Sequence, residues 1–420
     1  MKHVIIGNGP AGVIAAETLR KLDANAEIVL AGDEPEPPYS RMAIPYLLMG
    51  NIAEQGTHLR KDSEHFSRLN IRLVNARVEK IDSAAKSVKL ANGDTLAYDR
   101  LLIATGSHPV QPPVPGIDLP GVHTCWTLAD ARQIIAQAKP GARVVQMGAG
   151  FIGCIIMEAL AARGVRLTVV EMGDRMVPRM MNATAGGMIR RWVEEKGVRV
   201  HVSTRVEAIT QANGAKGELT AKLSSGESLP ADLIISATGV RPNIAFLQGS
   251  GVKTKDGVLV DDSLQTSVPG IYAAGDVTES IGLISGLPQL NAVQPNAADQ
   301  ARVAAANMAG KLSPFQGSLA INVLDTLGLI STSFGQWWGE SKADGGDSAE
   351  LLDAEKFRYL SLQFGEDVLI GATSLGWSDH VGALRGLIQG RVRLGAWKGR
   401  LLADPTQFMA AYLGAAQGSA

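Results

Sequence analysis

The residues with the clearest capacity for chemistry form two glycine-rich turns, each followed about twenty positions later by an acid. The first turn consists of Gly7, Asn8, Gly9, Pro10, Ala11 and Gly12. The second consists of Gly148, Ala149, Gly150, Phe151, Ile152 and Gly153. Asp33 and Glu34 follow the first turn, and Glu171 follows the second. Backbone N–H groups at such turns bind phosphate, and the acid accepts hydrogen bonds from ribose hydroxyls, so the pattern indicates two dinucleotide sites.

Each turn lies between an apolar run and an amphipathic segment, which are the strand and the helix that must position it. The first unit has an expected strand at 3–6, a helix at 13–22 and a strand at 28–30. The second has a strand at 143–147, a helix at 154–163 and a strand at 165–170. One glycine motif could be a structural turn, whereas two complete strand–turn–helix–strand–acid units predict two nucleotide-binding folds.

The three glycines of a turn have separate tasks in this interpretation. Gly7 permits the tight turn, Gly9 lets a pyrophosphate approach the backbone, and Gly12 lets the helix pack closely on the strand. Residue types in the second turn repeat this spacing.

The repetition extends beyond the turns. An antiparallel meander is expected between 74 and 103, with a hairpin turn at Asn92-Gly93, and it leads into Ala104, Thr105 and Gly106. A second meander is expected at 202–229, with turns at Asn213-Gly214 and Ser225-Gly226. The strand after it ends in Ala237, Thr238 and Gly239. Each lobe is therefore predicted to repeat a turn, a meander and a strand ending in small residues.

Another carboxylate comes late in the chain, where the run 270–274 ends in Gly275 and Asp276. Asp276 could be an ordinary helix N-cap, but the small residues before it favour a ribityl hydroxyl as its partner. An alanine-rich helix expected at 291–309 would direct its positive end towards the same place. An electron-rich flavin carbonyl would gain from that dipole.

These elements predict the α/β fold class, with two Rossmann-like domains and a C-terminal α+β domain. Residues 1–111 and 241–312 form a discontinuous first domain, 112–240 the second and 313–420 the third. In the third domain we expect strands at 319–323, 357–362 and 368–372, and helices at 381–389 and 405–413. Residues 343–348 are expected to form a mobile turn. Trp337 and Trp338 are expected to be buried or interface aromatics rather than a partner-facing patch.

Composition narrows the function classes. The 420 residues carry a net charge of −1 without a basic block, which argues against nucleic-acid binding and against an anionic membrane surface. The N-terminus lacks the pattern of a secretory signal, and the uncharged run 144–157 is too short to span a bilayer. A cytoplasmic protein without membrane insertion is expected. The seven histidines form no metal-binding pattern.

The two cysteines, Cys125 and Cys154, lie far apart in the sequence. Their spacing excludes CxxC, CxxxxC and zinc-knuckle motifs and fits a reducing compartment. We expect both to be inert packing residues.

With two nucleotide units, paired Ala-Thr-Gly endings and the run 270–276, residues 1–310 resemble the FAD/NAD(P)-dependent pyridine nucleotide-disulfide oxidoreductase superfamily, whose fold is glutathione-reductase-like. The resemblance implies FAD on the first unit, NAD(P)H on the second and a C-terminal interface domain that often builds a homodimer. Gly32-Asp33-Glu34, then residues 38–41 and Pro45, look like the branch that contains ferredoxin and rubredoxin reductases and nitrite reductase flavin domains.

The resemblance also implies site residues. For FAD these are Gly7, Gly9, Pro10, Ala11, Gly12, Asp33 or Glu34 at the adenosine ribose, Arg41 and Pro45 lining the cleft, Val78 at the adenine through its backbone, Ala104, Thr105, Gly106, Gly275, Asp276 and Val293. For NAD(P)H they are Gly148, Gly150, Phe151, Ile152, Gly153, Glu171 and Gly239. No side chain is expected to be catalytic, because the chemistry belongs to the cofactors, and no metal is expected.

NADH is expected rather than NADPH. Glu171 stands at the tip of its strand, where a carboxylate accepts ribose hydroxyls and repels a 2′-phosphate, and Met172 rather than arginine follows it. Arg175 and Arg179 lie close enough downstream to leave NADPH open.

The chain departs from the superfamily at its redox centre. Residues 40–60 contain no cysteine, so the disulfide pair of the reductases and the single cysteine of NADH oxidase relatives are both absent. The lysine and glutamate that pair near the flavin N5 in ferredoxin reductases are Tyr46 and Ile155 here. Losing both avoids an unpaired buried charge, and we expect a less polar nicotinamide pocket.

Three functions compete at this point. The first is hydride transfer from NADH to FAD N5 and onward electron transfer to a ferredoxin- or rubredoxin-type carrier, or to a partner subunit of a complex. The second is a small-molecule reductase or NADH oxidase. The third, a non-enzyme class, is a flavoprotein whose redox state gates its assembly with a partner. The three differ in what receives the electrons.

Overall fold

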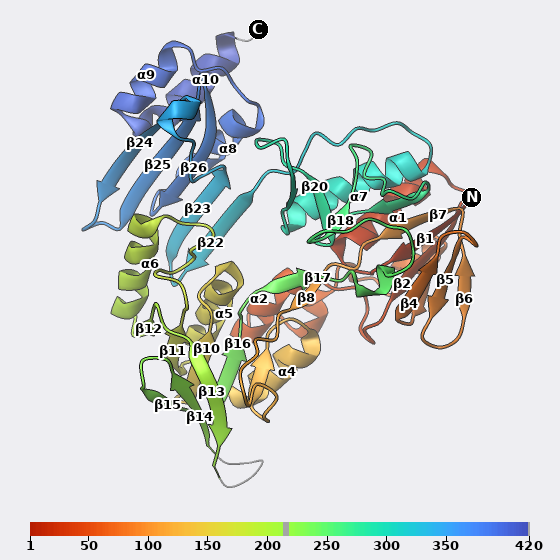
Figure 1. Cartoon of the computed structure of the whole chain (residues 1–420), viewed down its shortest axis with the longest axis horizontal. Helices are drawn as coiled ribbons and strands as arrows, with labels where there is room; N and C mark the ends of the chain where they lie inside the picture. The colour runs from red at the N-terminus through yellow and green to blue at the C-terminus, as the bar shows by residue number, and fades with distance from the viewer. Residues whose placement is uncertain (213–217, 419–420) are drawn as a thin grey trace. The chain divides into compact units, whose positions relative to one another are not determined.

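The structure is a computed structural model of the chain and describes residues 1–212 and 218–418. The turn predicted at Asn213-Gly214 lies outside the described residues. The chain divides into two compact units. Unit 1 consists of Met1–Ala43, Ile52–His108 and Val240–Leu319, and unit 2 of Ile44–Asn51, Pro109–Gly239 and Ala320–Ala420 (Figure 1).

Unit 1 is built on a parallel five-stranded sheet with the strand order β19-β7-β1-β2-β3. Its strands are β1 (Lys2–Ile6), β2 (Glu27–Gly32), β3 (Ile71–Asn75), β7 (Arg100–Ile103) and β19 (Ile271–Ala273). Ile5, Leu30 and Leu102 pack against the helices α1 (Pro10–Leu22) and α7 (Gln294–Met308). Alternate residues, including Val4 and Leu101, pack on the opposite face, so both faces of the sheet are buried.

The predicted first meander forms the other layer of unit 1. It consists of β4 (Val78–Asp82), β5 (Ser87–Leu90) and β6 (Thr95–Ala97), an antiparallel sheet of its own. The remaining strands are β8 (Ser107–Pro109), β17 (Val240–Pro242), β18 (Val258–Leu259), β20 (Thr278–Ile281) and β21 (Pro288–Leu290). Short helices are α3 (His65–Arg68), η1 (Arg41–Ala43), η2 (Glu54–Thr57) and η3 (Ala245–Leu247). The layers place the carboxyl ends of β1, β7 and β19 next to one another, because these strands are parallel neighbours.

Unit 2 repeats this plan. Its parallel sheet has the order β12-β11-β10-β16-β9. The strands are β9 (Val122–Thr124), β10 (Arg143–Met147), β11 (Arg166–Val170), β12 (Arg199–His201) and β16 (Leu233–Ser236), with the meander β13 (Val206–Gln211), β14 (Leu219–Leu223) and β15 (Ser228–Ala231). The helices are α4 (Leu128–Gln137), α5 (Phe151–Ala162) and α6 (Ala183–Glu195). The duplication and the α/β class are therefore present in the fold.

The C-terminal segment of unit 2 is an antiparallel sheet in the order β22-β23-β26-β25-β24 with three helices (Figure 1). The strands are β22 (Ile321–Thr326), β23 (Leu329–Gly335), β24 (Gly346–Asp353), β25 (Arg358–Gly365) and β26 (Val368–Leu375). The helices are α8 (Val381–Gln389), α9 (Ala396–Ala403) and α10 (Phe408–Gly418), with η4 (Lys342–Asp344) and η5 (Pro405–Gln407). β23, β24 and α9 were not expected from the sequence.

The structure corrects one expectation for this segment and narrows another. Residues 343–348 do not form a simple turn, because η4 leads directly into β24, which pairs along its whole length with β25. Trp338 is 64% exposed in the turn after β23, so it is not buried, and its expected role as an interface aromatic stays a prediction. Its ring meets that of Trp337 edge to face, with the ring centroids 5.6 Å apart.

The helix α2 (Ile44–Met49) groups with unit 2 although the chain on both sides of it belongs to unit 1. It packs against α4 and α5. Arg163 at the end of α5 fixes it by donating a hydrogen bond to the Leu48 carbonyl (2.8 Å). Compared with the predicted domain boundaries, residues 44–51 and 320–420 are both part of the unit that holds the second glycine turn.

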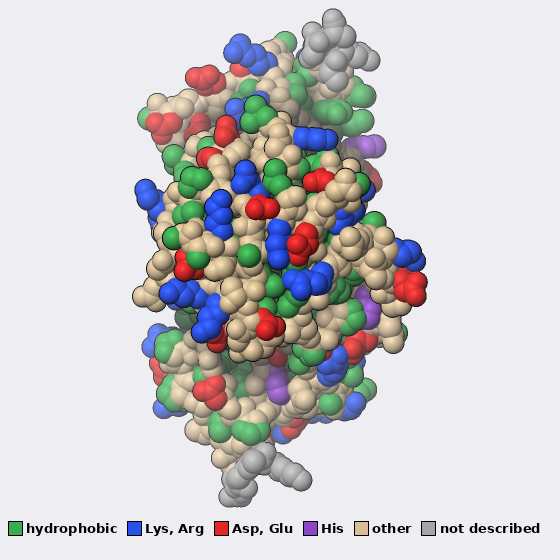
Figure 2. Space-filling view, turned by 90° about the vertical axis from the view of Figure 1, so that its right-hand side faces the viewer, with side chains coloured by type: hydrophobic (Ala, Val, Ile, Leu, Met, Phe, Trp, Pro, Cys, Tyr) green, Lys and Arg blue, Asp and Glu red, His purple; other side chains and the backbone are tan. Residues whose placement is uncertain are grey.

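The surface mixes charges of both signs. On the face drawn in Figure 2, lysine and arginine side chains are interspersed with aspartate and glutamate. None of the helices in the described residues is both long and apolar enough to cross a membrane.

Candidate dinucleotide-binding sites

The three glycines of the first turn occupy three different environments. Gly7 has φ +107°, and a Cβ there would lie 2.1 Å from the Ala104 carbonyl oxygen. A Cβ on Gly12 would lie 1.8 Å from the Gly7 carbonyl oxygen, so α1 could not approach the turn with any side chain at that position. A Cβ on Gly9 would meet none of the described atoms within 4 Å. The protein fills the space at two of the glycines and leaves it open at the third.

The second turn has the same arrangement. Gly148 has φ +99°, and a Cβ there would lie 2.4 Å from the Ala237 carbonyl oxygen. A Cβ on Gly153 would lie 2.5 Å from the Gly148 carbonyl oxygen, whereas one on Gly150 would meet no described atom within 4 Å. Phe151 and Ile152, two of the predicted contacts, begin α5 directly behind this open glycine.

The helices at these turns differ in their capping from α4 and α6. In the described structure no side chain caps the N-terminus of α1, α5 or α7. By contrast, α4 is capped by Thr127 and α6 by Asn182. Uncapped N–H groups next to an open glycine need an acceptor, and a phosphate supplies one. The residues at both turns therefore fit a dinucleotide, and Pro10 and Ala11 lie at the start of α1.

Glu171 is fixed beside the second turn. Its Oε2 accepts a hydrogen bond from the Ala149 N–H (2.6 Å), and its Oε1 accepts one from the Gly173 N–H (2.7 Å). Met172 is 74% exposed. Arg175 donates to the Met181 carbonyl (3.0 Å) and pairs with the neighbouring aspartate, so its guanidinium is already engaged.

Glu34 is fixed beside the first turn by side chains. Its Oε1 accepts a hydrogen bond from Arg41 Nη2 (2.6 Å), and its Oε2 accepts one from the Tyr39 hydroxyl (2.5 Å). Asp33, the other acid expected at the adenosine ribose, is exposed. Arg41 belongs to η1 in unit 1, whereas Pro45 is in α2 and therefore groups with unit 2.

Asp276 lies at the carboxyl end of β19, next to α1 and α7. The turn before it contains Gly275 with φ +87°, where a Cβ would be 3.1 Å from the Ala11 Cβ. Burial raises the pKa of Asp276, while a hydrogen bond from Ser107 Oγ (3.4 Å) and the charge of Arg41 act in the opposite direction. A carboxylate in this position needs further donors, and ribityl hydroxyls would supply them.

The two strand endings in Ala-Thr-Gly are also alike. Thr105 donates through its hydroxyl to the Asn243 carbonyl (3.0 Å), and Thr238 donates to the Val110 carbonyl (3.2 Å). Gly106 and Gly239 have φ +63° and +111°, and a Cβ on either would meet no described atom within 4 Å. Both endings therefore leave open backbone at the carboxyl edge of a parallel sheet.

Within the described structure, the remaining predicted residues make no hydrogen bond that bears on the sites, and only their positions are given. Val78 is 8% exposed at the start of β4, Ala104 is buried, and Val293 is the residue before α7. Tyr46 and Ile155, the positions expected to replace an ion pair, lie on α2 and α5, which pack against each other.

Four polar side chains that sequence reasoning did not single out position these sites. Gln300, 2% exposed on α7, accepts a hydrogen bond from the Gly275 N–H (2.8 Å). Gln146, buried in β10, donates to the Gly148 and Gly153 carbonyls (2.9 Å each). The other two are Ser107 and Tyr39. The one signal available was a polar residue on the expected buried face of a helix or strand, as for both glutamines.

The environments of both cysteines disfavour the reactive thiolate, although Cys125 is only half-buried. Burial raises the pKa of Cys125 and of Cys154 to about 12. Cys154 is fully buried, with its Sγ 3.5 Å from the Ala149 carbonyl oxygen. The expectation that both are inert is consistent with this environment.

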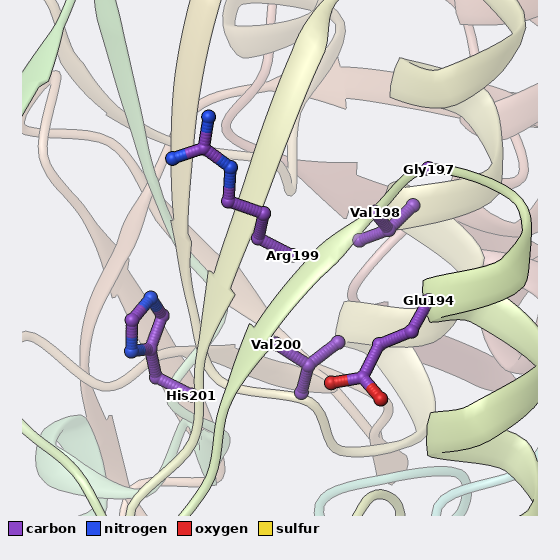
Figure 3. A pocket seen from close by; sticks show the side chains of 6 residues that line it. All are labelled: Glu194, Gly197, Val198, Arg199, Val200 and His201. Carbon is purple, nitrogen blue, oxygen red and sulfur yellow. The ribbon is translucent and has the colours of Figure 1, made fainter.

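A shallow pocket lies at the edge strand β12 of unit 2, and neither glycine turn contributes to its lining (Figure 3). Arg199 and His201 point to one side of the strand, and Val198 and Val200 point to the other, towards Glu194 (Figure 3). None of these residues belongs to either predicted site.

Comparisons with known proteins agree with this geometry. The chain is 31% identical over 408 residues to the NADH-dependent phenylglyoxylate dehydrogenase subunit epsilon of Aromatoleum evansii, covering 96% of this chain and 95% of that one. It is 35% identical over 325 residues to an NADH oxidase of Methanocaldococcus jannaschii, covering 75% and 71%. The structure of a ferredoxin reductase for the CYP199A2 system of Rhodopseudomonas palustris superposes with a TM-score of 0.83 at 27% identity, covering 91% and 93%.

The family model described as pyridine nucleotide-disulphide oxidoreductase matches residues 1–305, which include both glycine turns, both strand endings and Asp276. Relatives of the chain are NAD(P)H-dependent flavin oxidoreductases, among them reductases of ferredoxin-type carriers. The chain belongs to the pyridine nucleotide-disulphide oxidoreductase family.

Proposed function

We propose that the chain is an FAD-containing oxidoreductase that takes a hydride from NADH and passes the electrons to a carrier protein or to a partner redox subunit. One observation carries the proposal: a single chain has two open, uncapped glycine turns, while burial raises the pKa of both of its cysteine thiols to about 12. Two nucleotides would bind, and neither thiol forms the thiolate that a sulfur relay between them and an acceptor needs. The acceptor must therefore take electrons from the flavin itself.

In unit 1, the N–H groups at the start of α1 and the open backbone of Gly9 would hold the FAD pyrophosphate. Glu34 would accept the adenosine ribose hydroxyls, and Asp276 would accept the ribityl hydroxyls. The uncapped N-terminus of α7 would stabilise negative charge on the reduced ring. When bound, FAD supplies the ability to accept a hydride and to release electrons singly or in pairs.

In unit 2, Gly150 and the start of α5 would hold the nicotinamide dinucleotide, and Glu171 would accept its adenosine ribose hydroxyls. NADH is preferred in this proposal because a 2′-phosphate would meet the Glu171 carboxylate. The Arg175 guanidinium is already bound to the Met181 carbonyl and to a neighbouring carboxylate. An arginine in that state is a poor partner for a 2′-phosphate.

The extent of the similarity favours a protein acceptor. A match over 96% of this chain must include most of residues 320–418, whereas a match over 75% leaves a quarter of the chain out. The protein matched almost throughout is named a subunit. This supports a role in which the C-terminal segment contacts a partner, either another subunit or a second copy of the chain, and the exposed Trp338 is available for such a contact.

The alternatives have specific support and specific tests. An NADH oxidase or small-molecule reductase is supported by the name of the relative from Methanocaldococcus jannaschii. It requires that oxygen or a small oxidant reoxidise the protein quickly. An assembly role would require that NADH change the oligomeric state.

Anaerobic stopped-flow spectroscopy tests the proposal. The purified yellow protein is mixed with NADH or NADPH, and the bleached protein is then mixed with a rubredoxin, a ferredoxin or air-saturated buffer. We expect fast bleaching by NADH, slower bleaching by NADPH, and faster reoxidation by a carrier protein than by oxygen. Failure of both nicotinamides to bleach the flavin would exclude the reductase function, and fast reoxidation by oxygen alone would favour the oxidase.

A further inference from the structure

Strand register shows that the two units carry their ribose acid at different positions. The first glycine of each turn donates its N–H to a carbonyl on the neighbouring strand, that of Ala31 in unit 1 (2.7 Å) and that of Val170 in unit 2 (2.8 Å). The residues that follow, Gly32 and Glu171, are therefore counterparts. The acid of unit 1 is not at the strand tip, where unit 2 has it.

The space beside the first turn is filled in a way that excludes an acid there. A Cβ on Gly32 would lie 2.3 Å from Asn8 Cγ, so the Asn8 side chain occupies the place that a side chain at position 32, the counterpart of Glu171, would take. The carboxylate that serves unit 1 must come from further along the chain. Glu34, two residues beyond Gly32, is the one that other groups hold in place.

The two acids are held by different donors. Backbone N–H groups of Ala149 and Gly173 fix the two oxygens of Glu171, at 2.6 and 2.7 Å. For Glu34 the donors are side chains, the Tyr39 hydroxyl at 2.5 Å and Arg41 Nη2 at 2.6 Å. A mobile glutamate in a loop loses rotamer freedom when it binds a ligand, and this loss weakens binding. A carboxylate that is already fixed before the ligand binds avoids that cost and binds the ligand more tightly.

Tyr39 is itself well fixed. It is 7% exposed, and the backbone on either side is hydrogen-bonded, with Ser40 N–H donating to the Thr57 carbonyl and Leu59 N–H donating to the Pro38 carbonyl (2.9 Å each). Its hydroxyl accepts a hydrogen bond from Arg41 Nη1 (2.9 Å) while donating to Glu34. The charge of Arg41 thus reaches the carboxylate both directly and through the tyrosine, and such chains of hydrogen bonds reinforce one another.

We infer that Tyr39 is a positioning residue for FAD: its hydroxyl orients the Glu34 carboxylate so that the acceptor positions left free meet the hydroxyls of the adenosine ribose. A carboxylate has about four acceptor positions, and two are used here. The inference rests on the proposed FAD site. It assigns to Tyr39 and Arg41 in unit 1 the task that two backbone N–H groups perform in unit 2.

The test measures how well the protein recognises one ribose hydroxyl. FAD and an FAD analogue without the 2′-hydroxyl of the adenosine ribose are titrated into apoprotein, and binding is followed by the change in flavin fluorescence. Wild-type protein should prefer FAD by about tenfold, the worth of a hydrogen bond to a charged group. Tyr39→Phe should bind FAD more weakly and prefer it by less than about threefold, because the oriented acceptor is lost.

Tyr98→Phe is the matched control. The Tyr98 hydroxyl is buried in unit 1 and has no hydrogen-bond partner among the described residues, so its removal should leave FAD affinity and the preference unchanged. Glu34→Asp, whose carboxylate is one methylene shorter, should lose the preference with the Tyr39 ring intact. This variant serves as the test if Tyr39→Phe does not fold, as judged by circular dichroism.

Three outcomes are decisive. A Tyr39→Phe protein that keeps the wild-type preference would reduce Tyr39 to a packing residue and overturn the inference. Wild-type protein that binds FAD but does not distinguish the analogue would show that Glu34 is not the ribose acceptor. Wild-type protein that binds neither ligand would overturn the proposed function itself.

Discussion

Gly9→Ala and Gly12→Ala should separate the two tasks that glycine performs in the first turn. A Cβ at position 9 meets no described atom within 4 Å, and Gly9 has φ −73° and ψ −171°, which alanine adopts without strain. A Cβ at position 12 would lie 1.8 Å from the Gly7 carbonyl oxygen. The first substitution fills space that a phosphate needs, and the second fills space that the protein occupies.

The two substitutions should therefore act on different quantities. For Gly9→Ala, the free energy of unfolding of the apoprotein should change by less than about 1 kcal/mol, because two effects oppose each other. Alanine lowers the conformational entropy of the unfolded chain, which stabilises the fold, but it is a poorer N-cap residue than glycine, which destabilises it. FAD affinity should fall by about 100-fold or more, since the methyl group separates the phosphate from charge-assisted hydrogen bonds. For Gly12→Ala, unfolding should become easier by about 1–3 kcal/mol or more, because α1 must move away from the turn.

The assay is urea unfolding of the apoprotein combined with FAD titration. Gly150→Ala is the control, because it fills the corresponding open position in the second turn and should abolish NADH binding while FAD affinity stays unchanged. The reasoning would be refuted by wild-type FAD affinity in Gly9→Ala. A loss of apoprotein stability in Gly9→Ala as large as that in Gly12→Ala would refute it equally.

Three further predictions concern single groups. Glu171→Ala should lower the ratio of kcat/KM for NADH over NADPH by about 10- to 100-fold, since a charged hydrogen-bond acceptor is lost, and an unchanged ratio would contradict its role. Burial lowers the pKa of His3 from 6.5 to about 4, so the unfolded chain binds the proton first as pH falls. The free energy of unfolding should then decrease by up to about 3 kcal/mol between pH 6.5 and 4, and a similar decrease in His3→Leu would exclude this cause. Thiol alkylation at pH 8 should leave NADH-dependent activity unchanged, because Cys125 and Cys154 have pKa values of about 12; inactivation that Cys125→Ala prevents would contradict this.

The parts of the fold that could be predicted are those whose strands are buried on both faces. β1, β2, β10 and β11 are mainly apolar runs next to glycine turns, and their parallel sheets formed as expected. β23 escaped prediction because Ser331, Thr332 and Ser333 are fully buried within it, so that polarity in the sequence did not indicate exposure. The backbone of β23 is hydrogen-bonded to both neighbouring strands, β22 and β26, and no local sequence pattern predicts that these strands lie beside it.

Long-range contacts explain the remaining differences. The edge strand β24 has few apolar residues and is defined by its pairing with β25. Residues 44–51 could not be assigned to unit 2 from the sequence, because what holds them is the packing of α2 on α4 and α5 and the Arg163 hydrogen bond. Composition and periodicity indicate which secondary structure a segment prefers. The element against which the segment packs depends on residues about 100 positions away.

The same distinction applies to the sites. Residue types and spacing were enough to single out candidate glycines and acids, because phosphate and ribose impose those types. They were not enough to propose Glu34 rather than Asp33 as the ribose acceptor, because that proposal depends on the Asn8 side chain beside Gly32 and on donors from residues 39–41. The role of the glutamines that hold the turns could not be predicted for a similar reason, since each acts through a contact that only the folded chain creates.

The two sites also differ in the sequence separation of the residues that build them. In unit 2, Glu171 is fixed by residues 149 and 173, so one strand–turn–helix–strand unit completes it. In unit 1, the loop at Ser40 is joined to Gln294 (3.1 Å), and α7 returns from late in the chain to hold the Gly275 N–H through Gln300. These connections also build the core between α1 and α7. A ligand held by so many segments would be released only when they separate, which suits the FAD proposed for unit 1. The locally built site of unit 2 suits the proposed nicotinamide dinucleotide, which would bind and leave in each turnover.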